Sequence, residues 1–178
     1  MNRTIWTIGH SNRTLEEFLA VLAPARIESI ADVRRFPGSR KWPHFGGEAL
    51  RESLGAQGIA YLHLPELGGR RGRAASGSPN TAWRVESFNA YADHMQSEEF
   101  REGLARLMTS AEARRTAIMC SEAVPWRCHR RLIADALLVR GWEVVDLMSP
   151  TQQKPHPLTE FARVEGERVT SPGGTLFG

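Results

Sequence analysis

The sequence predicts the α/β fold class: a single three-layer domain with a mainly parallel sheet of about five strands flanked by helices. Short apolar runs alternate with segments of helical periodicity over about 150 residues, which is the pattern of strand–helix–strand units. Apolar residues make up 41% and charged residues 24% of the 178 residues, ordinary values for a globular protein. No apolar run approaches the roughly 20 residues that cross a bilayer. We therefore expect a protein with a core of its own and no membrane partner.

The first strand is expected at residues 4–8, in a buried apolar run that a Gly-His-Ser turn follows. A helix is expected over 14–25. Thr14 and Glu17 have the spacing of a capping box, which favours a helix start at this point. Pro24 is expected to stop the helix, because proline has no N–H for the next turn.

The second strand is expected at 27–33, and the loop RRFPGSRKWPHFGG follows it. A helix over 48–58 is expected to end at Gly58, since glycine readily adopts the left-handed conformation that closes helices. The third strand is expected at 59–64.

The next segment, Gly68 to Pro79, is rich in glycine, serine and arginine. Structureless loops of this length are uncommon in compact domains. We therefore expect this segment to be either disordered or a mobile lid. Two helices, over 85–95 and 97–111, are expected to follow it.

The fourth strand is expected at 115–120 and the fifth at 142–148, with a helix over 128–141 between them. These elements complete an α/β domain over 1–150. The tail 151–178 contains prolines and glycines, and we expect it to be irregular, either packed on the domain or fraying from it.

Charge and cysteine content indicate which partners and compartment to expect. The net charge is +3, which permits nucleic acid or phosphate partners without requiring them. Of the 23 basic residues only Lys41 and Lys154 are lysines, and arginines form bidentate contacts with anions. The N-terminus has no apolar core of signal-peptide length, so we expect a cytoplasmic location. The two cysteines are then free thiols, metal ligands or a transient redox pair rather than a structural disulfide.

Three polar segments follow strands of the predicted sheet. In parallel α/β sheets, ligands bind beyond the carboxyl ends of the strands. His10 and Ser11 follow the first strand, Asp32 to Arg35 span the end of the second, and Cys120 to Glu122 follow the fourth. The sequence therefore predicts that these segments meet at one edge and form a site.

The stretch CSEAVPWRCHRR, residues 120–131, contains both cysteines. A helix is expected to start between Pro125 and His129, and free N–H groups at a helix start attract anions and lower the pKa of a nearby thiol. Cys120 is the candidate nucleophile, although Cys128 can take the same role. Taken alone, Cys120 is better explained as one more buried residue of an apolar strand, and the residues that follow it favour a functional role.

The remaining candidates bind substrate or move protons. Glu122 and His10 are the candidate proton donors and acceptors. The candidate substrate-binding residues are Ser11, Asp32, Arg34, Arg35, Cys128, His129 and Arg130. For Asp32 and its arginines, an ion pair that only shapes the loop explains the pattern as well as binding does.

Two alternatives remain open at this point. Cys120, Cys128 and His129, with His10 or Glu122, can form a tetrahedral metal site, although the spacing lacks a Cys-x-x-Cys knuckle. The second alternative is a nucleic-acid-binding module without turnover. The loop after the second strand interleaves basic residues with aromatic ones, and the segment after Gly69 adds more arginines. No cofactor and no metal are assigned, and the oligomeric state is left open.

The stretches TIGHS, DVRRFPGS, GIAYLHLPELGG and CSEAVPWRCHRRLIADALLVRGWEVVDL resemble the family catalogued as domain of unknown function 488. The resemblance covers about residues 4–148, and its distinctive feature is Cys-x-Glu followed by Cys-His-Arg. It implies a bacterial or archaeal α/β protein and supports the choice of site residues, but it brings no activity with it. The layout is also similar to rhodanese and Cys-based phosphatase domains, from which the longer spacing between Cys120 and Arg127 departs.

The sequence therefore predicts an uncharacterised enzyme that acts on a phosphorylated or nucleotide-like anionic substrate. Its site lies in a cleft at the carboxyl ends of the strands, with arginines that clamp the anion.

Overall fold

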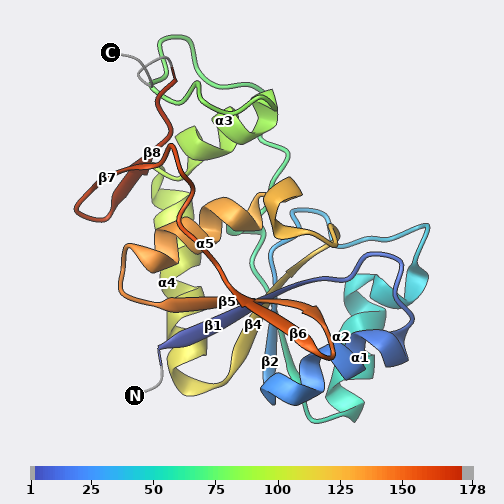
Figure 1. Cartoon of the computed structure of the whole chain (residues 1–178). Coiled ribbons are helices and arrows are strands. Elements are labelled where there is room, and N and C mark those ends of the chain that lie inside the picture. Colours follow the sequence, from blue (N-terminus) through green and yellow to red (C-terminus); the bar gives the residue numbers. More distant parts are fainter. Residues whose placement is uncertain (1–2, 174–178) are drawn as a thin grey trace.

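A six-stranded sheet forms the centre of residues 3–173, the part of the chain that the computed structural model describes (Figure 1). From one edge to the other, the strands are β3 (Ala60–His63), β2 (Ser29–Asp32), β4 (Thr116–Cys120), β1 (Thr4–Gly9), β5 (Glu143–Ser149) and β6 (Gln152–Pro155). The first five are parallel, and β6 runs antiparallel to β5. The predicted α/β class with a mainly parallel sheet is confirmed, with one strand more than expected.

Helices cover both faces of this sheet and form the outer layers (Figure 1). The helices are α1 (Leu15–Leu22), α2 (Gly47–Ala56), α3 (Glu86–His94), α4 (Glu98–Ala113) and α5 (Arg130–Leu138). In β4, Ala117 and Met119 belong to the core beneath α1 and α2, whereas Ile118 belongs to the core beneath α4 and α5. This alternation places successive side chains on opposite faces, so β4 supports two cores. Among the described helices, none combines the length and the apolar character needed to span a bilayer.

The helix starts and ends have local causes. The Thr14 hydroxyl accepts a hydrogen bond from the Glu17 amide at 3.1 Å, and the Glu17 carboxylate accepts one from the Thr14 amide at 2.9 Å. The predicted capping box is therefore confirmed. Four short 3-10 turns begin at or next to a proline, at Ala23–Ala25, Pro43–Phe45, Pro65–Leu67 and Pro125–Arg127. The last of these delays the start of α5 until Arg130, later than the sequence suggested.

The order of the strands determines where a ligand site can form. The chain leaves β1 through α1 on one face of the sheet and leaves β4 through α5 on the other face. Because β1 and β4 are neighbours, their outgoing connections diverge and leave a crevice beyond their carboxyl ends.

The segment 68–79 follows a defined path and is held at several points, so the expectation of disorder is wrong. The Asp93 carboxylate, on α3, accepts hydrogen bonds from the Ala75 amide at 2.9 Å and from the Asn80 side chain at 2.8 Å. It also accepts one from the Ser78 hydroxyl. A single carboxylate thus organises the far half of the segment, which the glycine-rich composition did not indicate.

The tail after residue 150 is more regular than its prolines suggested. It contains β6 and a hairpin of β7 (Arg163–Glu165) and β8 (Arg168–Thr170), whereas residues 174–178 lie outside the described part. Pro155 is tolerated in β6 because this strand is at the edge of the sheet, where a missing N–H leaves no partner unpaired. The Ser171 amide donates to the Asn80 side chain at 2.7 Å, which fastens the tail to the segment before α3.

A buried histidine joins the tail to the sheet and to α5. His156 Nδ1 lies 3.0 Å from Asp146 Oδ2 on β5, and its Nε2 lies 3.7 Å from Asp135 Oδ1 on α5. Burial alone would lower the pKa of His156, but the two carboxylates outweigh burial and raise this pKa from 6.5 to about 9. The imidazolium is therefore the stable form near neutral pH.

This raised pKa predicts a pH-dependent stability. A group whose folded pKa is raised stabilises the fold fully below its unfolded pKa of 6.5, and the stabilisation is lost as pH rises through about 9. We expect about 3 kcal/mol of unfolding free energy to depend on His156 at neutral pH. Urea unfolding across this pH range measures it as the difference between the natural protein and His156→Gln. A difference that does not change with pH would show that His156 is neutral in the fold.

Candidate active site

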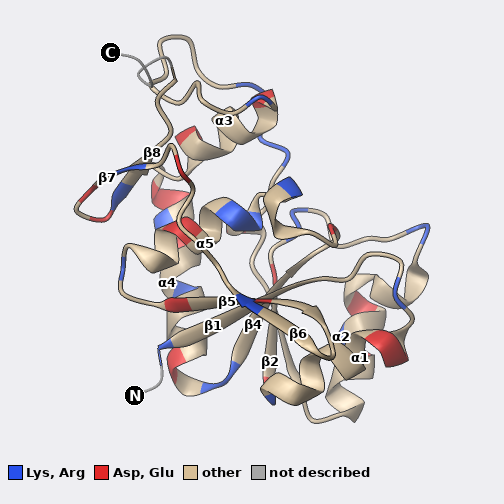
Figure 2. Ribbon diagram, in the orientation of Figure 1, with Lys and Arg blue, Asp and Glu red and all other residues tan. Residues whose placement is uncertain are grey.

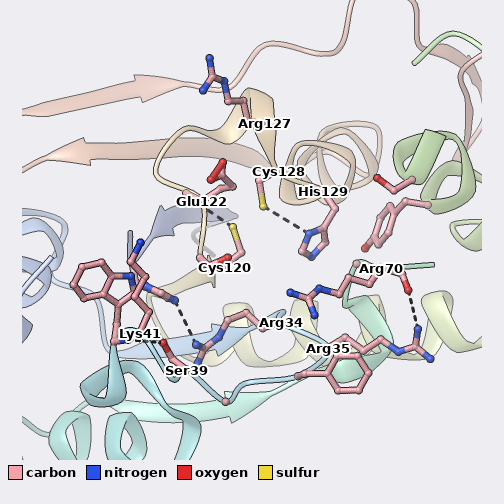
Figure 3. A pocket seen from close by; sticks show the side chains of 18 of the residues that line it. Arg34, Arg35, Ser39, Lys41, Arg70, Cys120, Glu122, Arg127, Cys128 and His129 are labelled. Carbon is pink, nitrogen blue, oxygen red and sulfur yellow. Dashed lines mark hydrogen bonds between the residues drawn. The ribbon is translucent and has the colours of Figure 1, made fainter. Parts of the chain in front are cut away.

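A cavity of about 520 Å³ opens at the carboxyl ends of β1, β2 and β4. Its walls come from His10 after β1, from residues 34–36 and 38–42 after β2, from residues 120–122 after β4 and from residues 127–129 before α5. Gly69, Arg70 and part of α3 close the remaining side. Figure 3 shows that side chains from these separate segments converge on one space.

The strand ends that the sequence placed together are direct neighbours. The His10 amide donates to the Cys120 carbonyl at 2.9 Å, and the Val33 amide donates to the Met119 carbonyl at 3.0 Å. Gly9 allows this close approach, because a Cβ added there would lie 1.5 Å from the Glu122 carbonyl oxygen. The loop after β4 is thus pressed against the end of β1.

Asp32 orients the side chain of a cavity-lining arginine without lining the cavity itself. It is fully buried and is not among the cavity-lining residues. Its carboxylate accepts hydrogen bonds from Arg34 Nε at 2.9 Å, Arg34 Nη2 at 2.7 Å and the Tyr61 hydroxyl at 2.5 Å. Asp32 therefore orients Arg34, which does line the cavity, and does not itself meet a ligand there. Tyr61 was not singled out by the sequence.

His10 is a neutral hydrogen-bond acceptor at this edge. Its Nδ1–H donates to the Ser11 carbonyl at 2.9 Å, so the lone pair is on Nε2, which lies 3.4 Å from Arg34 Nη1. Burial, with a smaller contribution from the charge of Arg34, lowers the pKa of His10 from 6.5 to about 4. His10 therefore orients Arg34 rather than acting as an acid at neutral pH. Ser11 lies outside the cavity, in a left-handed conformation with φ 51°.

Both cysteines are free thiols that line the cavity floor, Cys120 from the end of β4 and Cys128 just before α5. Cys128 Sγ accepts a hydrogen bond from the Arg130 amide at 3.5 Å and lies 3.7 Å from His129 Nδ1. The Nε2–H of His129 donates to the Val33 carbonyl at 3.0 Å, which leaves the Nδ1 lone pair facing Cys128. His129 can therefore accept a hydrogen bond from the Cys128 thiol, but burial lowers the pKa of His129 and makes it a weak base.

The two thiols differ in acidity. Burial raises the pKa of Cys120 well above its usual value, and the neighbouring Cys128 sulfur raises it further. Burial would also raise the pKa of Cys128, but the hydrogen bond from Cys120 and the charge and amide of Arg130 outweigh burial and lower this pKa. Cys128 is therefore the more acidic of the two thiols and the better candidate nucleophile, whereas the sequence favoured Cys120.

Arg130 is a buried cation beneath the two thiols that lacks a carboxylate partner in the described part of the chain. It is only 1% exposed and is not among the cavity-lining residues, so it does not reach a ligand as the sequence suggested. Its Nη2 donates to the Ala123 carbonyl at 3.1 Å, but Nε and Nη1 have no hydrogen-bond partner. Within residues 3–173 no carboxylate forms an ion pair with it. A buried charge without a counter-ion is costly, and a Cys128 thiolate supplies that counter-ion.

The cavity wall is strongly basic. It carries the cationic side chains of Arg34, Arg35, Arg40, Lys41, Arg70 and Arg127 against the single carboxylate of Glu122. In the described part of the chain, the side chains of Arg40, Arg70 and Arg127 form no hydrogen bond or ion pair, so they are available to a ligand. Figure 2 shows basic residues on the loops at this end of the sheet, and Figure 3 shows Arg34 and Arg70 on the side of the thiols, with Arg35 reaching the Arg70 carbonyl and Arg127 pointing away from the thiols.

Aromatic residues complete the wall. Phe36 and Trp42 come from the loop after β2, where the sequence showed aromatic and basic residues interleaved. Phe88 and Tyr91 come from α3 and were missed, because nothing in an ordinary amphipathic helix indicates that one of its turns faces a distant strand end. A flat, partly apolar ligand can stack on such rings.

The structure gives the metal alternative no ligand set. Among residues 3–173, no group of three or more histidine, cysteine, aspartate or glutamate residues is placed to hold a metal ion. His10 and His129 each use one ring nitrogen for a backbone carbonyl.

The family model described as "Domain of unknown function DUF488" matches residues 14–137, more than half of the chain. No curated protein and no solved structure matches the chain.

Proposed function

Because this chain belongs to the DUF488 family, whose function is unknown, we propose its function from the cavity: an enzyme that acts on a small phosphorylated or nucleotide-like anion, with Cys128 as its nucleophile. The observation that carries this proposal is the position of the Cys128 sulfur, which lines a cavity with a cationic wall and accepts a hydrogen bond from the Arg130 amide at 3.5 Å. Enzymes use lowered thiol pKa values in this way to make a nucleophile at neutral pH. The two free thiols fit a reducing, cytoplasmic location.

The anion is held by the cavity-lining arginines whose side chains form no hydrogen bond or ion pair within residues 3–173. Arg40, Arg70 and Arg127 come from three different segments, so together they can surround a phosphate. The aromatic side of the cavity, at Trp42 and Phe88, accepts a base or another flat group. Charge and shape together therefore favour a nucleotide-like ligand over a bare ion.

The chemistry follows from the groups at the floor. The Cys128 sulfur forms a bond to the electrophilic atom of the substrate, and the leaving group departs with its electron pair and takes a proton from water. Water then attacks the intermediate, Glu122 accepts a proton from that water, and the Cys128 thiolate leaves. Glu122 is the only carboxylate on the described cavity wall, so it is the natural base for this second step.

Binding of adenosine monophosphate and of inorganic phosphate, measured by calorimetry at low salt, tests the proposal. We expect Arg70→Ala and Arg127→Ala each to weaken binding about tenfold, since each removes a charge-assisted contact. Arg163→Ala, an exposed arginine on β7, is the matched control and should bind normally. Cys128→Ser should bind the ligand but show no turnover of phosphorylated or nucleotide substrates. If neither ligand binds at low salt, the proposal is wrong.

A second candidate function is the binding of single-stranded nucleic acid, and two exposed aromatic residues favour it. Phe36 is 62% exposed and Trp126 is 53% exposed, and each stands next to an arginine in the sequence. Exposed rings beside guanidinium groups suit base stacking. An oligonucleotide that binds much more tightly than the monophosphate, with an affinity that falls steeply with salt and with Phe36→Ala, would favour this candidate.

A further inference from the structure

We propose that Cys120 and Cys128 are a redox pair, which a hydroperoxide oxidises to a disulfide across the cavity floor and thereby switches the site off. The switching rests on the proposed function, since it removes the Cys128 nucleophile. The formation of the disulfide itself depends only on the two sulfurs and their surroundings.

The two sulfurs share one location. Both cysteines line the cavity, so an oxidant that enters the cavity can reach them although each residue is at most 4% exposed. Each thiol lies close enough to influence the pKa of the other, and Figure 3 shows both sulfur atoms on the same side, between Glu122 and His129. Only residues 121–127 separate the two cysteines in the chain, so closing the bridge encloses a short loop.

The surroundings favour attack by one sulfur and resolution by the other. Cys128 faces the Arg130 amide and the buried guanidinium that lacks a carboxylate partner, both of which stabilise its thiolate. Within residues 3–173, Cys120 accepts no backbone amide and makes only a long contact, 3.9 Å, with the Glu122 carbonyl, and its burial outweighs the charge of Arg130. It therefore keeps its proton and serves as the resolving thiol.

One hydroperoxide molecule is the only oxidant that formation of the disulfide requires. The Cys128 thiolate attacks the terminal peroxide oxygen, which keeps its hydrogen, the O–O bond breaks, and Cys128 becomes a sulfenic acid. The other oxygen leaves as alkoxide or hydroxide and takes a proton from water. Cys120 then attacks the Cys128 sulfur, the S–S bond forms, and the hydroxyl departs with the Cys120 proton as water. Both sulfurs together lose two electrons, which the peroxide gains.

The disulfide should be reduced easily. Oxidation removes the anion that balances Arg130 and leaves a buried guanidinium with two unpartnered nitrogens. The reduced form is thus favoured, and dithiols with a stabilised reduced form are strong oxidants. We therefore expect glutathione at cellular concentrations to restore both thiols.

Hydrogen peroxide treatment of the reduced full chain tests the proposal. We expect loss of both free thiols, a mass lower by about two units for the two hydrogens removed, a monomeric cross-link between Cys120 and Cys128 on peptide mapping, and full reversal by glutathione. In Cys120→Ser, the Cys128 sulfenic acid should persist and be trapped by dimedone. In Cys128→Ser, Cys120 should remain a thiol. Oxidation of both cysteines to sulfinic acid without a cross-link, or a cross-link only between chains, would overturn the proposal.

Adenosine monophosphate binding, measured before and after oxidation, separates this proposal from the proposed function. If the cross-link forms but neither form binds the nucleotide, the redox pair stands and the proposed function fails. If the nucleotide binds but peroxide leaves both thiols free, the redox pair fails and the proposed function stands.

Discussion

Gly9→Ala is expected to unfold or strongly destabilise the protein, with a loss of about 4 kcal/mol or more of unfolding free energy. The reason is steric: the new Cβ would lie 1.5 Å from the Glu122 carbonyl oxygen and 3.0 Å from the Ala123 Cα, and both are backbone atoms that cannot rotate away. Either β1 or the loop after β4 must move, and that loop directly follows Cys120. Urea unfolding measures the loss, and the reactivity of the thiols reports the disturbed loop.

Gly55→Ala is the matched control for this substitution. Gly55 lies in α2, where an added Cβ meets nothing within 4 Å. Alanine is the better helix former, so this variant should gain up to about 1 kcal/mol. A Gly9→Ala protein as stable as the natural one would show that the end of β1 and the loop after β4 are not pressed together.

Arg130→Met should lower the alkylation rate of Cys128 by about tenfold or more at neutral pH. In the natural protein, iodoacetamide should modify Cys128 fast and Cys120 slowly, because only Cys128 has a lowered pKa. Removal of the guanidinium takes away the charge that favours the thiolate, and one unit of pKa changes the thiolate fraction about tenfold. Mass mapping of the alkylated peptides gives the two rates separately.

The stability of the same variant distinguishes this role from a structural one. Replacing a buried, poorly paired charge by an apolar side chain of similar length is often neutral or stabilising, so Arg130→Met should not unfold more easily. Arg114→Met, an exposed arginine at the end of α4, should change neither quantity. If Cys128 and Cys120 react equally slowly in the natural protein, Cys128 is not a thiolate.

The fold was largely readable from the sequence because its signals are local. Apolar runs, the Thr14–Glu17 spacing and helix-ending glycines each act within a few residues, and they predicted five strands and five helices. β6 was missed because its sequence, Gln152 to Pro155, is polar and ends in proline, and only the neighbouring β5 makes it a strand. The path of 68–79 was missed because Asp93, which organises it, lies beyond the segment.

The position of the site was predictable and the roles within it were not. Because ligands bind beyond the carboxyl ends of parallel strands, the sequence alone predicts that His10, Arg34 and Cys120 lie at one edge of the sheet. It did not show that Asp32 faces away from the cavity or that Arg130 is buried beneath the thiols. The acidity of each cysteine depends on that burial, which is a property of packing and not of spacing along the chain.

The contacts of His156 attach the tail both to the sheet and to α5. His156 lies between Asp146 on the sheet and Asp135 on α5, and the Asp135 carboxylate also accepts the Thr159 amide at 3.1 Å. The same helix begins directly after Cys128 and His129. A segment that lies beyond the family's matched residues 14–137 thus anchors the helix that follows Cys128, so shortening the chain there should loosen α5.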